Sequence, residues 1–148
     1  MTDFIKKVEV RWSDLDPNFH LRHSVYYDIG AYCRVSFFNE NGITPAVMFS
    51  LNIGPIIFRE ECLFRKEIKF EDNITVTLEL EKCNVDFSRW TMVHQLFKNE
   101  NILAAFITVD GAWMDTNKRK LTSPPDLFKE GISHMPKTKN FNLPPDKN

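Results

Sequence analysis

Glycine, cysteine and long apolar runs are all scarce in this 148-residue chain, and each scarcity argues against a class of protein. The five glycines form no Gly-rich phosphate-binding loop, and neither GxSxG nor GxGxxG occurs, so serine-hydrolase, P-loop and dinucleotide redox chemistry have no support. The three cysteines, Cys33, Cys62 and Cys83, are widely spaced and include no CxxC pair. This spacing argues against a zinc finger and against a dithiol redox site. No run approaches the ~20 apolar residues that a membrane-spanning helix needs.

An excess of charge of either sign is also lacking. Nineteen basic and twenty acidic residues leave a formal net charge of -1, whereas a dedicated nucleic-acid-binding protein normally shows a basic excess. The first residues, MTDFIKKVEV, contain no apolar stretch of signal-peptide length, and the cysteine pattern fits a reducing compartment. We therefore expect a cytoplasmic protein without a nucleic-acid or membrane partner.

Phenylalanine is abundant, with 13 copies, and much of the chain alternates apolar and polar residues with the two-residue period of strands. Strands are predicted over 4–13, 56–70, 74–81, 90–98 and 102–115. Apolar residues at three- and four-residue steps predict a helix from Ser24 to Phe38, with Ser24 as N-cap and Gly42 at its end. Since Phe58, Phe64 and Phe70 share one face of the longest strand, we expect them in the core.

The order of these elements predicts an α+β fold in one domain over residues 1–135. One long helix cannot cover both faces of a five-stranded antiparallel sheet, so a sheet wrapped around the helix is the expected arrangement. Residues 136–148 are rich in Pro, Lys and Asn and are predicted to form a loose tail.

The segment Asp14–His20, between the first strand and the helix, is the candidate site for chemistry. Asp, Asn and Pro are ordinary turn formers, so a structural turn is the simplest interpretation. A calcium loop of the EF-hand type begins with the same spacing of acidic residues, but Phe19 and Val25 stand where it needs Gly and Glu. A transition-metal site lacks further ligands at a suitable spacing. We therefore expect no metal and no cofactor.

The stretch RWSDLDPNFHLRHSVYYD resembles the signature of hotdog-fold acyl-CoA thioesterases of the 4-hydroxybenzoyl-CoA thioesterase type, D-x-D-x-x-G-H-V-N-N-x-x-Y. The matching positions are held by Asp14, Asp16, His20, Leu21 and Tyr26. The sequence departs from the pattern at Phe19, where Gly is usual, and at Arg22 and His23, where paired Asn residues are usual. Weaker similarities to later strands of the family extend the resemblance over about residues 5–130.

The resemblance implies the hotdog fold, with a long central helix wrapped by a five-stranded antiparallel sheet, and hydrolysis of an acyl-CoA or related acyl thioester. Asp16 would act as nucleophile or general base, His20 would orient it or shape the loop, and the helix N-terminus would polarise the thioester carbonyl. The implied substrate-contacting residues are Phe19, Arg22, His23, Ser24 and Tyr26. The family also implies a homodimer or homotetramer. The basic run 118–120 is more typical of a solvated hairpin than of a contact to coenzyme A phosphates.

A non-catalytic acyl or acyl-CoA binding protein on the same fold is the main alternative, because Phe19 and Arg22 break the usual motif. A hotdog dehydratase is a weaker alternative, since none of the four histidines fits its motif clearly. A small ligand-carrying barrel is a further alternative at the level of the fold.

Overall fold

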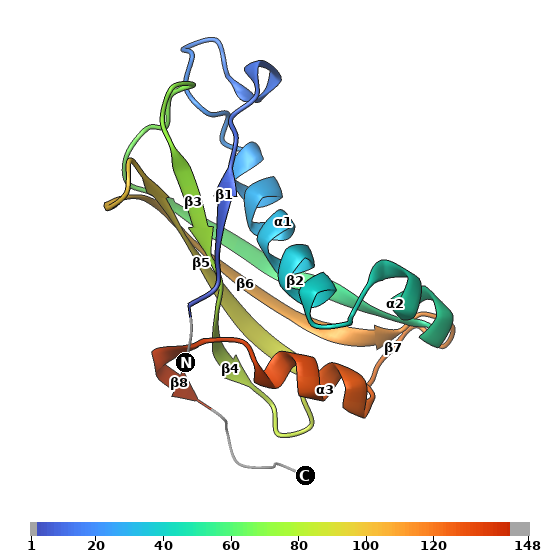
Figure 1. The fold of residues 1–148 in the computed structure, drawn as a ribbon. Coiled ribbons are helices and arrows are strands. Elements are labelled where there is room, and N and C mark those ends of the chain that lie inside the picture. Colours follow the sequence, from blue (N-terminus) through green and yellow to red (C-terminus); the bar gives the residue numbers. More distant parts are fainter. Residues whose placement is uncertain (1–2, 143–148) are drawn as a thin grey trace.

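The computed structural model describes residues 3–142, which form a curled antiparallel sheet accompanied by a few helices (Figure 1). Along the chain the elements are β1 (Ile5–Val8), the 3-10 helix η1 (Trp12–Asp14), α1 (Val25–Glu40), α2 (Pro45–Leu51), β2 (Ile53–Phe64), β3 (Ile74–Thr77), β4 (Glu79–Cys83), β5 (Arg89–Lys98), β6 (Ile102–Asp115), β7 (Lys120–Leu121), α3 (Asp126–Ser133) and β8 (Lys137–Asn142). The α+β class is therefore confirmed.

The sheet has eight strands within the described residues, not the five that the sequence predicted. The expected strand over 74–81 is divided into β3 and β4, which pair with opposite ends of β5. β5 continues into β6 through a hairpin, and β6 pairs along nearly its whole length with β2. Since β2 pairs only with β6 among the described strands, its other side is a free edge of the sheet.

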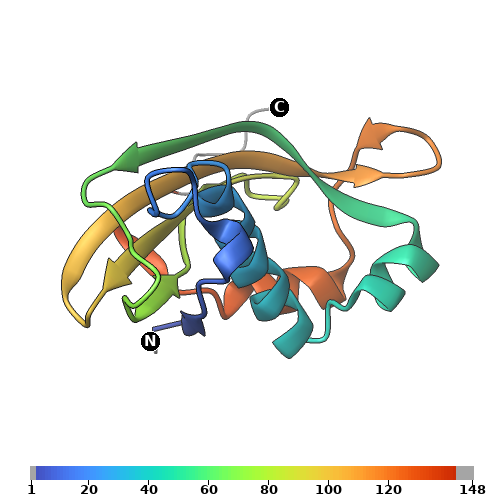
Figure 2. The same ribbon diagram turned by 90° about the horizontal axis from the view of Figure 1, so that it is seen from above.

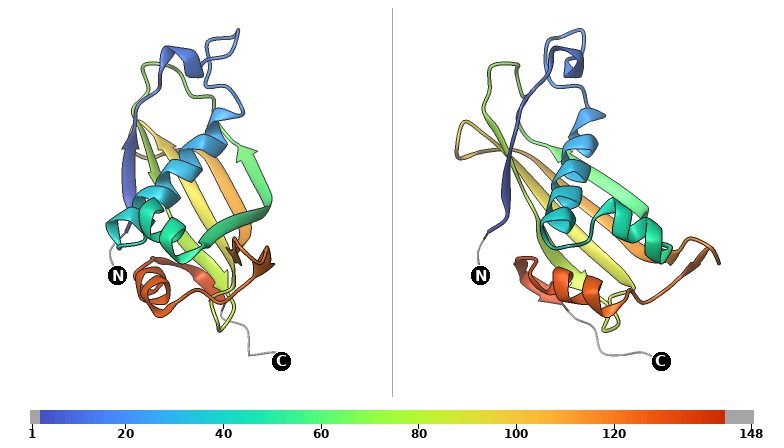
Figure 3. Two further views of the ribbon diagram at one scale, coloured as in Figure 1. Left: turned by 90° about the vertical axis from the view of Figure 1, so that its right-hand side faces the viewer. Right: turned by 45° about the vertical axis from the view of Figure 1, so that its right-hand side comes forward.

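Helix α1 crosses one face of the sheet (Figure 2; Figure 3). No described strand or helix covers the side of α1 that faces away from the sheet. The residues that face the sheet recur at four-residue steps and are buried: Val25, Ile29, Cys33 and Phe37. They meet the inward-facing side chains of the strands, which include Val76, Leu96, Ile107 and Val109. The buried face of α1 repeats about every 3.6 residues and the buried face of each strand every two residues, and these two periods are what predicted the helix and the strands from the sequence.

The predicted phenylalanine core is wrong. Phe58, Phe64 and Phe70 are 53%, 53% and 54% exposed. The register of β2 shifts between Ile57 and Arg59, so the alternation does not continue through Phe58, and β2 ends at Phe64. A bulge reverses the face on which later residues lie, and a pattern of apolar residues does not reveal it. The aromatic core instead consists of edge-to-face contacts along Phe37, Phe38, Trp113 and Phe128.

The chain also departs from the predicted ends of two elements. β1 ends at Val8, so Trp12 belongs to η1 and is 72% exposed, not part of a strand face. Residues 137–142, expected in a loose tail, form β8, which runs parallel to β4. The backbone N–H of Leu80 donates to the carbonyl of Pro136 at 2.7 Å, which brings the two segments together. The rest of the predicted tail, residues 143–148, lies outside the described residues.

A buried polar network joins α1 to the sheet. His94 on β5 is fully buried, with Nδ1 2.9 Å from the Thr77 carbonyl and Nε2 2.9 Å from the guanidinium of Arg34 on α1. Arg34 also lies 3.7 Å from the carboxylate of Glu60 on β2. A guanidinium has no acceptor and a carbonyl has no donor, so Nδ1 carries the proton and Nε2 accepts. His94 is therefore neutral, and burial together with Arg34 lowers its pKa to about 3.

Candidate functional site

The segment that carries Asp16 forms a tight hairpin. Leu15 and Leu21 form an antiparallel bridge, and the N–H of Phe19 donates to the carbonyl of Asp16 at 2.9 Å. Pro17 and Asn18 therefore occupy the centre of a four-residue turn, which is where such residues are favoured. The interpretation of this segment as a turn is confirmed, and the turn fixes the position of the Asp16 side chain.

The Asp16 carboxylate is held through one oxygen. Oδ1 accepts hydrogen bonds from the backbone N–H groups of Asn18, at 2.9 Å, and His20, at 3.1 Å. Oδ2 has no hydrogen-bond donor among residues 3–142. One oxygen therefore anchors the carboxylate, and the other is available to a ligand.

Phe19 adopts a left-handed backbone conformation, with φ of 64°. A residue in this conformation commonly follows a type I turn in three-residue hairpins, and glycine is preferred there because it has no Cβ. This geometry gives a physical reason for the Gly that thioesterase signatures carry at the position. A non-glycine residue in this region costs about 1–2 kcal/mol.

Phe19→Gly is accordingly expected to raise the melting temperature, by about 2–4 °C for a domain of this size. The side chain is 64% exposed, so little packing is lost. Thermal unfolding followed by calorimetry measures the change. Gly42 has φ of 82° and offers the reverse control, because Gly42→Ala places a Cβ in the same disfavoured region and should lower the melting temperature.

The loop before the hairpin is held by one ion pair and several hydrogen bonds. The carboxylate of Asp14, which is 4% exposed, accepts from the Arg11 guanidinium and the Arg11 backbone N–H at 2.9 Å each, and these bonds lower the pKa of Asp14. Arg22 donates to the carbonyl of Ser13 at 2.9 Å and to the hydroxyl of Ser24 at 3.2 Å. Asp14 and Arg22 therefore shape the loop that presents Asp16.

A hollow of about 320 Å³ opens beside the hairpin. Its lining comes from the hairpin, the start of α1 and the segment that follows β2: Asp16, His20, Leu21, His23, Tyr26, Phe64, Arg65, Lys66 and Glu67. The ring of Tyr26 packs edge-to-face on Phe64, with centroids 4.9 Å apart. The hollow therefore joins a carboxylate, a helix N-terminus and apolar rings.

The start of α1 matches the prediction in position but not in its capping hydrogen bond. Ser24 is already in a helical conformation, with φ of -71° and ψ of -25°, and its side chain makes no cap hydrogen bond. Ser24 occupies the N-cap position, as predicted, but its side chain does not cap the helix. The backbone N–H groups of His23 and Ser24 have no acceptor within the described residues. Unpaired N–H groups at a helix start attract negative charge.

Residues 10–132 match the model of the Thioesterase-like superfamily. The chain belongs to this family. No curated protein matches the sequence. The hotdog fold that the motif implied is consistent with this membership and with the curled antiparallel sheet.

Several solved structures have the same fold as this thioesterase-like chain. A hypothetical protein from Staphylococcus aureus, in complex with CoA, has a TM-score of 0.83 at 21% identity, covering 99% of this chain and 89% of that one. A DHNA-CoA thioesterase from Staphylococcus aureus has a TM-score of 0.80 at 18% identity, covering 90% of each chain. A 1,4-dihydroxy-2-naphthoyl-CoA thioesterase from Synechocystis has a TM-score of 0.79 at 13% identity, covering 90% of this chain and 97% of that one.

The structure brings some of the predicted site residues of the thioesterase-like chain together and leaves others outside. Four of them line the hollow: Asp16, His20, His23 and Tyr26. Phe19, Arg22 and Ser24 do not line the hollow, and Arg22 donates a hydrogen bond to Ser24. The imidazole of His20 pairs with Glu67 at 3.1 Å, so His20 contacts Asp16 through its backbone N–H.

Five lining residues were not predicted as site residues: Leu21 and, from the end of β2 onward, Phe64, Arg65, Lys66 and Glu67. The sequence predicted one continuous strand over 56–70, and residues inside a strand give no sign of lining a pocket. In the structure the strand ends at Phe64, and the N–H groups of Arg65 and Lys66 both donate to the Ala104 carbonyl. This local irregularity turns the segment toward the hairpin, where His20 bridges to Lys69.

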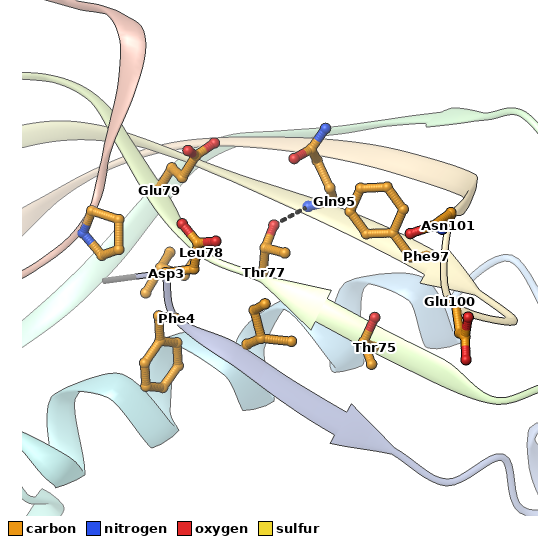
Figure 4. Close-up of a pocket in the computed structure, with 12 residues that line it drawn as sticks. Asp3, Phe4, Thr75, Thr77, Leu78, Glu79, Gln95, Phe97, Glu100 and Asn101 are labelled. Carbon is orange, nitrogen blue, oxygen red and sulfur yellow. Dashed lines mark hydrogen bonds between the residues drawn. The ribbon is translucent and has the colours of Figure 1, made fainter. Parts of the chain in front are cut away.

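A second hollow of about 350 Å³ lies at the other side of the sheet, next to β1 and β3 (Figure 4). Thr77 and Phe97 line it, and its carboxylates come from Asp3, Glu79 and Glu100. Burial, with Asp3 nearby, raises the pKa of Glu79. Because coenzyme A carries several negative charges, an acidic hollow is a poor fit for it.

Two absences concern residues 3–142 only. No cluster of three or more His, Cys, Asp or Glu side chains in this part of the chain is arranged to hold a metal ion. None of its helices is both long enough and apolar enough to span a membrane.

Proposed function

We propose that this protein hydrolyses an acyl-CoA or a related acyl thioester to a free acid and a thiol, at the hollow beside the Asp16 hairpin. The observation that carries the proposal is a carboxylate fixed through one oxygen, in the same hollow as the N-terminus of α1. Membership of the Thioesterase-like superfamily supports it, as does the fold shared with proteins that are named as CoA thioesterases.

Asp16 has the geometry to supply the attacking group. A thioester carbonyl is electrophilic, so catalysis needs a nucleophile and a site for the oxyanion. Oδ2 of Asp16 can take a proton from water as the water oxygen attacks the carbonyl carbon, and that proton can pass to the departing thiolate. It can equally attack the carbon itself, so that the C–S bond breaks, an anhydride forms and the thiolate leaves and takes a proton from water; a further water then hydrolyses the anhydride. Both routes give one acid and one thiol.

The start of α1 is proposed to stabilise the oxyanion. The free N–H groups of His23 and Ser24 and the helix dipole favour negative charge. Tyr26 adds a donor, because this buried residue lines the hollow and its hydroxyl has no hydrogen-bond partner among residues 3–142. Burial raises the pKa of Tyr26 to about 12, so the phenol keeps its proton near neutral pH.

Basic side chains favour a substrate with phosphates. Arg65 and Lys66 are exposed where they line the hollow, and their charges suit the phosphates of coenzyme A. The basic run 118–120 covers the turn before β7 and the first residue of β7, at the far end of the sheet from the hairpin (Figure 1). Within one chain, coenzyme A phosphates are therefore better served by Arg65 and Lys66.

Steady-state hydrolysis of a panel of acyl-CoAs, with short, long, branched and aromatic acyl groups, tests the proposal. We expect release of free coenzyme A from at least one class, detected with a thiol reagent. An aromatic preference would support the 4-hydroxybenzoyl-CoA type in particular. No turnover of any member of the panel, by folded protein, would contradict hydrolysis.

A non-catalytic acyl-CoA binding protein is the second candidate. The observation in its favour is that Asp16 already has a structural role, since its Oδ1 holds the turn. Titration calorimetry with acyl-CoA separates the two functions, because tight binding without release of thiol selects the binding protein.

The unpaired edge of β2 and the open side of α1 suggest a homodimer. Tyr32 and Val35 on α1 are 49% and 50% exposed, and Phe49 on α2 is 87% exposed. Exposed apolar side chains beside a free strand edge are typical of a surface that a second copy covers. We propose that this surface is the dimer interface.

Val35→Asp is expected to shift the protein from dimer to monomer at micromolar concentration, because it places a charge in the proposed interface. Val85, which is 45% exposed in the loop between β4 and β5, provides the matched control as Val85→Asp. Size-exclusion chromatography with light scattering measures the mass. A dimer that survives Val35→Asp would place the interface elsewhere.

A further inference from the structure

Two exposed aromatic rings stand together at the Asp16 hairpin. Trp12 and Phe19 are 72% and 64% exposed, their ring centroids are 6.2 Å apart, and their planes meet at 44°. Adjacent apolar rings in water are unfavourable unless something covers them, and aromatic residues dominate recognition surfaces. The pair needs an explanation that the hydrolytic groups do not provide.

The pair is held on a rigid support. Trp12 begins η1, whose last residue, Asp14, is bonded to Arg11, and Phe19 closes the hydrogen-bonded turn. Arg22 ties the carbonyl of Ser13 to the start of the helix. A surface ordered in advance loses little conformational entropy when a ligand binds. Such an ordered support is typical of a binding surface.

Phe19 has a backbone conformation that glycine adopts readily and that is unfavourable for a residue with a Cβ. Strained residues of this kind cluster at binding and active sites, although this chain also has five others, in ordinary turns and at a helix end. The strained backbone is that of Phe19, which directly precedes His20, and His20 lines the hollow. Phe19 and the candidate carboxylate therefore belong to one hairpin, and Trp12 in η1 lies beside Phe19.

We propose that Trp12 and Phe19 form a stacking surface for a flat aromatic group of the thioester whose reacting end occupies the hollow. The inference rests on the proposed function and deepens it. Aromatic rings stack on planar π systems in preference to alkyl chains. Either end of an aryl-CoA can supply such a group: the adenine of coenzyme A or an aromatic acyl ring. Arg65 and Lys66, in the same hollow, suit the phosphates of such a ligand.

Tryptophan fluorescence reports on this surface directly. Trp12 is exposed, whereas Trp90 and Trp113 are 4% and 0% exposed, so a change in the red-shifted emission reports on Trp12. The probes are coenzyme A, benzoyl-N-acetylcysteamine and hexanoyl-N-acetylcysteamine. A response to coenzyme A identifies adenine as the stacked group, and a response to the benzoyl probe alone identifies the acyl ring. The hexanoyl probe should give little response.

Matched variants locate the contact. Phe19→Leu keeps an apolar side chain and the backbone conformation but removes the ring. It should lower the affinity for the planar probe that responds by about 5- to 100-fold, as measured by calorimetry. Phe19→Tyr, which keeps the ring, should restore affinity to within a few-fold. Phe97→Leu, at the acidic hollow on the other side of the sheet, is the control and should leave affinity unchanged.

The outcomes separate this inference from the proposed function. No response of Trp12 to either planar probe, or an equal response to the hexanoyl probe, overturns the stacking surface even if thioesters are hydrolysed. Equal losses from Phe19→Leu and Phe97→Leu also overturn it. A response of Trp12 with loss in Phe19→Leu but no hydrolysis of any thioester supports the stacking surface and refutes only the hydrolytic function.

Discussion

Asp16→Asn is expected to lower kcat for thioester hydrolysis by at least about 100-fold while leaving the fold intact. The amide oxygen of asparagine can accept the same hydrogen bonds from Asn18 and His20 that Oδ1 accepts now, so the hairpin is preserved. The other position becomes an amide nitrogen, which can neither take a proton from water nor attack a carbonyl. This single substitution therefore separates the structural role of the Asp16 side chain from its proposed chemical role.

Asp16→Ala makes the companion measurement. It removes the anchor as well as the base, so it should lose activity to a similar extent and also about 1 kcal/mol of stability. His20→Gln tests whether the imidazole takes part. Because His20 contacts Asp16 through its backbone N–H, we expect less than a ten-fold fall in kcat. Wild-type rates in Asp16→Asn, with an unchanged melting temperature, would remove Asp16 from the mechanism.

Acid is expected to destabilise the protein through His94, by about 3 kcal/mol between pH 7 and pH 4. In the unfolded chain an ordinary histidine titrates near pH 6.5, whereas burial and Arg34 lower the pKa of His94 to about 3 in the folded protein. Between these values the unfolded chain binds more protons. The free energy of unfolding therefore falls as the pH falls from about 6.5 toward 3, and the contribution is fully present above pH 6.5.

His94→Gln isolates this contribution, since glutamine does not titrate. Denaturant unfolding at several pH values should show a flatter pH dependence in the variant, by up to one proton per molecule. The matched control is His134→Gln, because the side chain of His134 is 58% exposed. Parallel curves for the wild type and His94→Gln would contradict a neutral, buried His94.

The network around His94 also links the site to the sheet. Arg34 lies on α1, the helix whose first turn is proposed to hold the oxyanion, while His94 and Glu60 lie on β5 and β2. Gly30 permits the close approach of helix and strand, because a Cβ there would lie 3.1 Å from the His94 ring. The position of the helix start relative to β2 therefore depends on polar contacts as well as on apolar packing.

The local patterns of the sequence determined the parts of this protein that depend on neighbouring residues. Apolar segments on either side of a turn at 98–101 identified the strands β5 and β6, the four-residue repeat identified α1, and Asn18 with Pro17 identified the turn. The motif around Asp16 led to the family to which the chain belongs. These features follow from backbone preferences and side-chain periods, which act over a few residues.

Only the tertiary structure decided the features that depend on distant parts of the chain. The bulge in β2 exposed Phe58, the irregularity after Phe64 brought Arg65 and Lys66 into the hollow, and η1 placed Trp12 beside Phe19. β8 paired with β4 although its sequence resembles a tail. Each outcome depends on which backbone groups find partners elsewhere in the sheet, and no local pattern records that choice.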